Sequence, residues 1–289
     1  MIKHLRLKAY GKINLALDVL GKRDNGYHDV RMIMQTVGLH DRIELYRTKE
    51  PGIRLETNLF YLPNNEQNLA YRAAALLMEE FGVKEGVSIK LKKFIPVSAG
   101  MAGGSTDAAA VLVGVNRMFD LGFTKKELME RGVKLGADVP YCIMKGTALS
   151  EGIGEKLTAL APMPDCYILL AKPPIAVSTK MVYENLHANE LKEHPDIDGM
   201  VIALEEHSLQ GITERMENVL ETVTEVRYPV IAEIKACMKE CGAMNSLMSG
   251  SGPTVFGIFT EKEKAEKAAD AIRSRKLAKQ VFVTQPYNV

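Results

Sequence analysis

A glycine-rich loop contains the residues whose types and spacing most clearly allow chemistry. Its members are Pro96, Val97, Ser98, Ala99, Gly100, Met101, Ala102, Gly103, Gly104, Ser105 and Thr106. Glycine has no Cβ, so backbone N–H groups in such a loop can approach and point at an anion. An alanine-rich segment follows from Asp107 and favours a helix, whose N-terminus attracts negative charge. From the residues alone we expect an anion site, although an ordinary glycine-rich turn has the same composition.

Two common phosphate-binding motifs do not fit this loop. It lacks the Gly-Lys-Ser/Thr ending of a P-loop, and the spacing of Gly100 and Gly103 does not make Gly-x-Gly-x-x-Gly. Ser105 or Thr106 can cap the following helix and can also offer a hydroxyl to phosphate or to Mg²⁺.

Two charged residues elsewhere can support acid–base chemistry. Asp138 lies in the segment LGADVP, where Gly136 and Pro140 interrupt regular structure and can direct the carboxylate into a cleft. Such a carboxylate can accept a proton from a hydroxyl, although a turn-forming aspartate is the ordinary interpretation. Lys12 shares a predicted strand face with Asn14, and a lysine in such a place is usually solvated.

Hydrophobic periodicity predicts the elements that position these residues. The apolar face of the strand around Lys12 consists of Ile13, Leu15, Leu17 and Val19. Residues 69–81 have the period of a helix that Gly82 ends, and Thr124 with Glu127 forms a capping box that opens another helix. Further strands are predicted at residues 43–46, 87–91, 141–144 and 147–150.

The C-terminal part has a different order of elements. A strand at 167–171 is followed by helices that include 229–242, then by strands near 247 and at 254–259, a helix from 261 and a strand at 281–284. This order is typical of the ferredoxin-like, split βαβ arrangement. The proline-rich stretch 161–164 is the best boundary, so we expect one domain at 1–160 and another at 161–289.

The composition is that of a globular chain without a preference for polyanions. The 289 residues are 46% hydrophobic and 25% charged, and 37 basic against 36 acidic residues give a net charge of +1. This balance argues against nucleic acid or a membrane surface as a partner. There is no signal-peptide pattern, and no uncharged run approaches the ~18 residues of a membrane span. The four cysteines form no C-x-x-C pair, so we expect reduced thiols, no bound metal cluster and a cytoplasmic location.

The loop resembles the ATP-binding signature of the superfamily that includes galactokinase, homoserine kinase, mevalonate kinase and phosphomevalonate kinase. Ala102 and Met101 stand where many members have glycine and leucine. Three further motifs, KINL at 12–15, NGYH at 25–28 and LGADVP at 135–140, resemble the kinases of 4-diphosphocytidyl-2-C-methyl-D-erythritol in non-mevalonate isoprenoid synthesis. With GSGP at 250–253, the resemblance covers nearly the whole chain. It implies an α+β, two-domain kinase fold: an N-terminal ribosomal-protein-S5-like domain that binds ATP and a C-terminal ferredoxin-like domain.

The resemblance also implies roles for single residues. ATP would bind the glycine-rich loop with Mg²⁺, for which no protein ligand can be named, and the acceptor would be an alcohol that carries cytidine diphosphate. Asp138 would be the base that accepts the hydroxyl proton, and Lys12 its charge partner. The residues implied for the acceptor are Asn14 for the erythritol, Tyr27, His28 and Tyr183 for cytosine, and Gly250, Ser251 and Gly252 for its phosphates or reacting end.

Several alternatives remain at this point. Tyr183 can equally pack its own helix, and Asn68 can cap a helix or reach adenine. The runner-up activity is another alcohol kinase of the homoserine or mevalonate type, against which the GYH motif argues. A catalytically silent nucleotide-binding relative would not need both Lys12 and Asp138.

Overall fold

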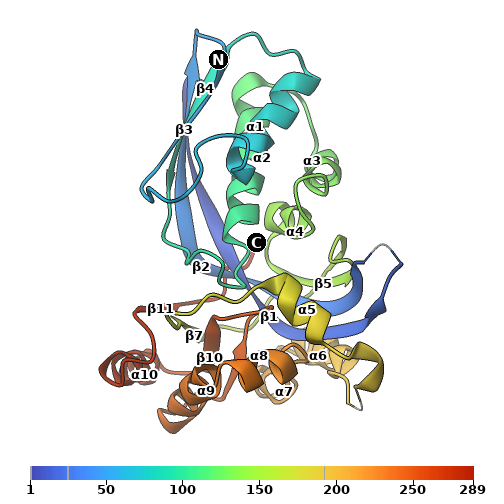
Figure 1. Ribbon diagram of the computed structural model, residues 1–289, viewed down its shortest axis with the longest axis vertical. Coiled ribbons are helices and arrows are strands. Elements are labelled where there is room, and N and C mark those ends of the chain that lie inside the picture. Colours follow the sequence, from blue (N-terminus) through green and yellow to red (C-terminus); the bar gives the residue numbers. More distant parts are fainter. Residues whose placement is uncertain (1, 25, 192) are drawn as a thin grey trace. The chain divides into compact units, whose positions relative to one another are not determined.

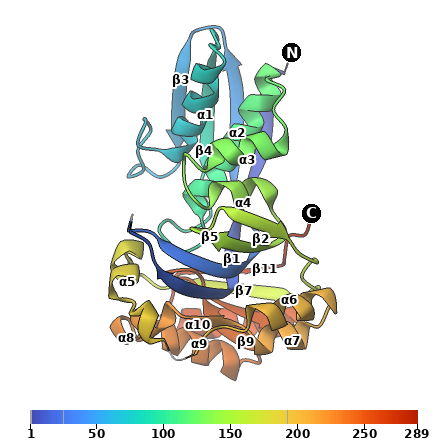
Figure 2. The ribbon, with the colours of Figure 1, turned by 90° about the vertical axis from the view of Figure 1, so that its right-hand side faces the viewer.

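The computed structural model describes residues 2–24, 26–191 and 193–289 and contains both helices and strands (Figures 1 and 2). The chain folds into two compact units. Unit 1 comprises residues 1–11, 39–97 and 102–144, and unit 2 comprises residues 12–38, 98–101 and 145–289. The long strands β1 (His4–Lys22) and β2 (His28–Thr48) contribute residues to both.

Unit 1 is a sheet covered on one face by helices. The end of β2 pairs antiparallel with β4 (Gly86–Lys92), which pairs in parallel with β3 (Gly52–Thr57). The helices α1 (Leu69–Glu80) and α2 (Gly103–Phe119) lie side by side in Figure 1. Alternate strand residues, among them Ile43, Leu45, Val87 and Ile89, are fully buried, as their period of two predicts.

Helix starts in unit 1 follow the predicted capping signals. The Asn68 side chain accepts a hydrogen bond from the Ala70 N–H at 3.0 Å, which confirms the capping alternative for that residue. Thr124 and Glu127 form the expected capping box at the start of α3 (Lys125–Gly132). These local signals work because the cap bonds join residues only two or three positions apart.

The strand predicted at 141–144 is wrong, because these residues belong to the helix α4 (Val139–Met144). Val139 through Ile143 are all buried, so the segment has no exposed face that could reveal a helical period. A short, wholly apolar helix cannot be told from a strand by periodicity. Pro140 lies in the first turn of α4, where proline is well tolerated, rather than interrupting regular structure.

Unit 2 contains the predicted ferredoxin-like sheet. Its strands are β7 (Tyr167–Lys172), β9 (Asn245–Met248), β10 (Val255–Phe259) and β11 (Gln280–Thr284), and all neighbouring pairs are antiparallel. The order β11-β7-β10-β9 and the packing of α9 (Val230–Glu240) and α10 (Lys262–Ser274) against it confirm the split βαβ arrangement (Figure 1).

The remainder of unit 2 is built on the other parts of β1 and β2. β2 pairs with β5 (Thr147–Gly152), β5 with β6 (Lys156–Ala159), and β1 with the short β8 (Glu217–Asn218). The other helices are α5 (Thr179–Asn185), the 3₁₀ turn η1 (Ala188–Glu190), α6 (Ile197–Glu205), α7 (Leu209–Glu214) and α8 (Glu221–Arg227). Ile13 to Val19 are buried on both strand faces, so Lys12, Asn14 and Asp18 are buried polar residues rather than solvated ones.

Three further expectations concern the whole chain. The boundary predicted between residues 160 and 161 stays a prediction, since the two compact units are each assembled from separate segments. Within residues 2–24, 26–191 and 193–289, no helix combines the length and the apolar character that crossing a membrane requires. All four cysteines are free thiols, of which Cys142, Cys166 and Cys237 are buried.

Candidate nucleotide and acceptor site

The N-terminus of α2 has no side-chain cap. Ala102 occupies the N-cap position with a left-handed φ of 56°, and no side chain caps the helix. The helix begins at Gly103, so Ser105 and Thr106 lie within its first turn, and the prediction that one of them caps it is wrong. The Thr106 hydroxyl donates instead to the Tyr10 carbonyl at 2.6 Å. The N–H groups of residues 103–105 have no helical carbonyl to bond, and the helix dipole adds positive charge there.

In unit 2, residues 98–101 of the glycine-rich loop pack against the second loop, which consists of Ser249 and the GSGP motif at 250–253. Gly100 has a φ of +71°, and a Cβ at this position would overlap the carbonyl oxygen of Ser249. The Ser249 hydroxyl donates to the Gly100 carbonyl at 2.9 Å. Gly250 also approaches closely, since its Cβ would lie 3.4 Å from the Gly100 oxygen. Glycine is therefore required at position 100 both for its backbone conformation and for this approach.

Lys12 and Asn14 lie beside these two loops. The Lys12 ammonium donates to Asn14 Oδ1 at 2.7 Å, and the Lys12 N–H donates to the Met101 carbonyl at 3.2 Å. Asn14 Oδ1 lies 3.5 Å from the position that a Cβ on Gly250 would take. Unit 2 thus brings together predicted residues from three separate motifs.

Asp138 lies in unit 1, half-buried and directly before α4. Its carbonyl accepts the Cys142 N–H at 3.0 Å, so it opens that helix as a capping residue does. The buried Val139 and Pro140 after it fix the backbone that carries the carboxylate. Its pairing with Lys12, which belongs to unit 2, stays a prediction.

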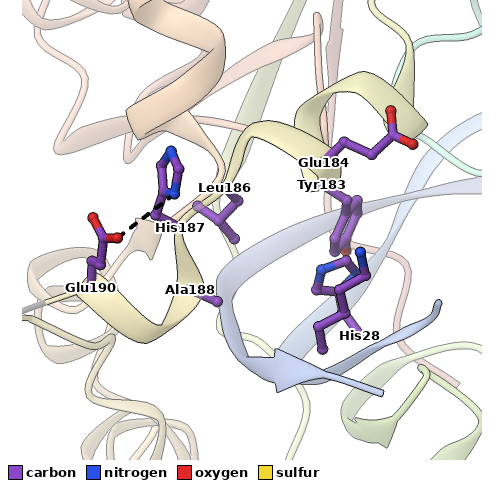
Figure 3. Close-up of a pocket in the computed structure, with 8 residues that line it drawn as sticks. His28, Tyr183, Glu184, Leu186, His187, Ala188 and Glu190 are labelled. Atoms are coloured by element: carbon purple, nitrogen blue, oxygen red, sulfur yellow. Dashed lines mark ion pairs between the residues drawn. The ribbon is translucent and has the colours of Figure 1, made fainter. Parts of the chain in front are cut away.

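A pocket of about 220 Å³ in unit 2 contains two of the three residues predicted for cytosine (Figure 3). The rings of His28 and Tyr183 line it, with centroids 5.0 Å apart at an interplanar angle of 42°. The other lining residues are Lys22, Glu184, Leu186, His187, Ala188 and Glu190. Burial, with a smaller effect of the Lys22 charge, lowers the pKa of His28, so its imidazole is neutral at pH 7. Tyr27 is not among the lining residues and is 57% exposed, and Asn25 lies outside the described residues.

The short helix α5 joins this pocket to the second loop. Ser178 caps it, Thr179 Oγ1 lies 2.8 Å from Ser251 Oγ, and Tyr183 follows one turn later at the pocket. Sequence reasoning missed Thr179 and Ser249. The signal available for them was only that each stands within a few residues of a motif already chosen.

The residues fit a nucleotide phosphate better than a dedicated metal site. Among the described residues there is no group of three or more His, Cys, Asp or Glu that could hold a metal. Magnesium bound with ATP needs few protein ligands, because phosphate oxygens and water complete its shell. The open helix terminus supplies N–H donors of the kind that phosphates bind.

Two family profiles match the chain. Residues 68–146 match the profile described as GHMP kinases N terminal domain, and residues 200–279 match GHMP kinases C terminal. Among solved structures, a 4-(cytidine 5'-diphospho)-2C-methyl-D-erythritol kinase superposes with a TM-score of 0.85 at 30% identity, covering 99% of this chain and 100% of that one. Homoserine kinase from Cytophaga hutchinsonii shares the fold, with a TM-score of 0.80 at 20% identity and coverage of 100% and 96%.

Sequence relatives narrow the assignment. A protein of Lachnospira eligens named 4-diphosphocytidyl-2-C-methyl-D-erythritol kinase is 54% identical over 286 residues, which are 99% of each chain. A protein of the same name from Clostridium perfringens is 46% identical over 284 residues, covering 98% of this chain and 99% of that one. The α+β, two-domain kinase fold expected from the sequence is thereby confirmed. This chain belongs to the GHMP kinases and, within them, to the family of the 4-diphosphocytidyl-2-C-methyl-D-erythritol kinases.

Proposed function

We propose that this chain transfers the γ-phosphoryl group of ATP to the 2-hydroxyl of 4-diphosphocytidyl-2-C-methyl-D-erythritol, a step of non-mevalonate isoprenoid synthesis. The observation that carries the proposal is the 54% identity, over 99% of both chains, to a kinase named for this acceptor. The alternative of a homoserine or mevalonate kinase is not favoured, since structural relatives of the homoserine and mevalonate types are only 13–20% identical. A cytoplasmic location and the absence of a nucleic-acid partner remain predictions.

The donor phosphates bind at the first turn of α2. The free N–H groups of residues 103–105 and the helix dipole favour negative charge there, and the glycines leave room for the backbone to approach. Bound Mg²⁺ would neutralise charge on the donor phosphates. The roles of the other loop residues, Pro96 to Ala102, are to shape this backbone rather than to supply side-chain chemistry.

Asp138 accepts the proton of the acceptor hydroxyl while the hydroxyl oxygen forms its bond to the γ-phosphorus and ADP leaves. Lys12 is the charge partner of Asp138 and stabilises the negative charge that develops on the reacting oxygens. Asn14 orients Lys12, since it accepts a hydrogen bond from the ammonium at 2.7 Å. A tertiary hydroxyl is a crowded nucleophile, so alignment contributes much of the rate.

Cytosine binds in the pocket at His28 and Tyr183. A neutral imidazole has one donor and one acceptor, which suits the hydrogen-bonding edge of a base. Tyr183 offers an aromatic face for stacking. Tyr27, the third residue assigned to cytosine, does not line the pocket and would meet the base outside it. Gly250, Ser251 and Gly252 then face the diphosphate, with Ser251 held by Thr179.

The test is a coupled assay of ADP release with 4-diphosphocytidyl-2-C-methylerythritol, homoserine and mevalonate as acceptors. We expect turnover only with 4-diphosphocytidyl-2-C-methylerythritol. Phosphorus NMR of the product should show a phosphate on the 2-hydroxyl. Turnover with only homoserine or mevalonate would contradict the acceptor, and no ADP release with any of them would contradict the kinase activity.

A further inference from the structure

A buried network of three charged side chains lies in unit 1 beneath the first turn of α2. The Lys93 ammonium, directly after β4, donates to Asp41 Oδ2 at 2.5 Å and to Asp107 Oδ2 at 2.7 Å. All three side chains are at most 4% exposed. Asp41, from β2, also accepts the N–H groups of Phe94 and Ile95 at 2.5 and 2.8 Å. The ammonium of Lys93, directly after β4, therefore joins one strand, β2, to one helix, α2.

Lys93 bonds α2 at Asp107 and lies close to Gly103, one turn earlier. Its ammonium lies 3.2 Å from the position that a Cβ on Gly103 would take, and it bonds the carboxylate of Asp107. Residues four apart lie on the same helix face. The bond to Asp107, with the ammonium close to Gly103 on the same face, limits the rotation of the first turn about the helix axis and hence the directions of the N–H groups of residues 103–105.

Burying the Asp107 carboxylate costs free energy that packing alone does not explain. Its Oδ1 is buried and has no hydrogen-bond partner among the described residues, and the network has two carboxylates for one ammonium. Burial, and less strongly Asp41, raises the pKa of Asp107 well above its usual range despite the opposing effect of Lys93. A leucine here would bury a similar volume without this cost.

We propose that Lys93 and Asp107 are positioning residues for ATP, which hold the first turn of α2 at the orientation that directs its free N–H groups at the phosphates. The inference rests on the proposed function, because it takes ATP to bind at this turn. It assigns to these residues no contact with the substrate.

Asp107→Leu is the decisive variant, because it removes one hydrogen bond and leaves Lys93 paired with Asp41. We expect the KM for ATP to rise about tenfold, which corresponds to about 1.4 kcal/mol. The kcat and the KM for the acceptor should stay within about threefold, because α2 is displaced and not unfolded. Asp107→Asn keeps an oxygen that can accept from Lys93, and should remain within about threefold of the wild type in all constants.

A matched control exists in unit 2. Lys235 is also held between two carboxylates, at 2.6 Å from Glu221 and 2.6 Å from Glu225. Glu225→Leu removes one of them and leaves the other pair, as Asp107→Leu does. It should leave the KM for ATP unchanged. An equal rise in the KM for ATP with Glu225→Leu, or an unchanged value with Asp107→Leu, would overturn the proposal.

Hydrogen exchange measured without nucleotide separates this inference from the proposed function. Asp107→Leu should accelerate amide exchange in residues 103–112 and not in 113–119, whereas Asp107→Asn should do neither. If the wild type released no ADP, the kinase activity would be refuted. Faster exchange confined to residues 103–112 in Asp107→Leu would still support the positioning role. Unchanged exchange in Asp107→Leu would refute the positioning role even in an active kinase.

Discussion

Replacing Gly100 by alanine should destabilise unit 2 through a contact that no local signal reveals. The residue has a φ of +71°, where an alanine costs roughly 1–2 kcal/mol. The new methyl group would also overlap the Ser249 oxygen and lie 3.1 Å from its carbonyl carbon. The backbone must move, which costs about 1–3 kcal/mol by overpacking and about 1 kcal/mol for the bond from the Ser249 hydroxyl to the Gly100 carbonyl.

A second glycine isolates the steric part of this cost. Gly82, after α1, also has a positive φ, +59°, but nothing lies within 4 Å of its Cβ position. Gly82→Ala therefore carries only the backbone strain, and the excess for Gly100→Ala is about 3 kcal/mol. For a chain of this size about 1 kcal/mol lowers Tm by about 2–4 °C, so Gly100→Ala should unfold about 6–12 °C below Gly82→Ala. Thermal unfolding followed by circular dichroism measures both, and midpoints that agree within about 2 °C would refute the contact between the two loops.

Four further outcomes are expected. Asp138→Asn should keep its affinity for ATP, measured by calorimetry, and lose at least about a thousandfold in kcat, as loss of a base allows; near wild-type turnover would remove its role. Tyr183→Leu should raise the acceptor KM about tenfold through lost stacking and leave the KM for ATP unchanged. Tyr183→Phe keeps the aromatic face and should change neither KM. Because the folded-state pKa of Asp107 is raised, the wild type loses stability as pH rises above the usual carboxyl range, whereas Asp107→Asn does not, so the Tm of Asp107→Asn should gain on the wild type with rising pH; a constant difference would contradict the raised pKa. A disulfide reagent should label Cys241 first in the native protein, since the other three thiols are buried and burial raises the pKa of Cys166 to about 12; equal rates for all four would contradict their burial.

Local interactions made part of this fold predictable. Caps such as Asn68 and Thr124 join residues two or three apart, so their signal lies within one short window of sequence. The strand prediction for residues 141–144 was wrong because it depended on distant interactions: other elements bury this segment, and its own sequence shows no exposed face. The ferredoxin-like order was predictable, since each of its strands is bounded by clear helices or turns.

The candidate site shows a similar division. Its motifs could be found from the resemblance, and Lys12, Asn14, Met101 and Gly250 do converge in unit 2. The contacts that position them join distant residues, such as Ser249 with Gly100, 149 positions apart. The buried network beneath α2 looked in the sequence like ordinary polar residues of strands and a helix. The network can be recognised only in the folded structure, because Lys93 is 14 positions from Asp107 and 52 positions from Asp41 in the sequence.

The packing of the two loops has a consequence for how the substrates affect each other. Gly100 bonds Ser249, and its neighbour Met101 accepts the N–H of Lys12, which in turn bonds Asn14. A displacement of residues 98–101 therefore reaches the side chains assigned to the acceptor through two or three hydrogen bonds. We accordingly expect Gly100→Ala to raise the KM for both substrates, in contrast to Asp107→Leu, which should affect ATP alone, and Tyr183→Leu, which should affect the acceptor alone. A rise confined to one substrate in Gly100→Ala would mean that the two loops move independently despite their contact.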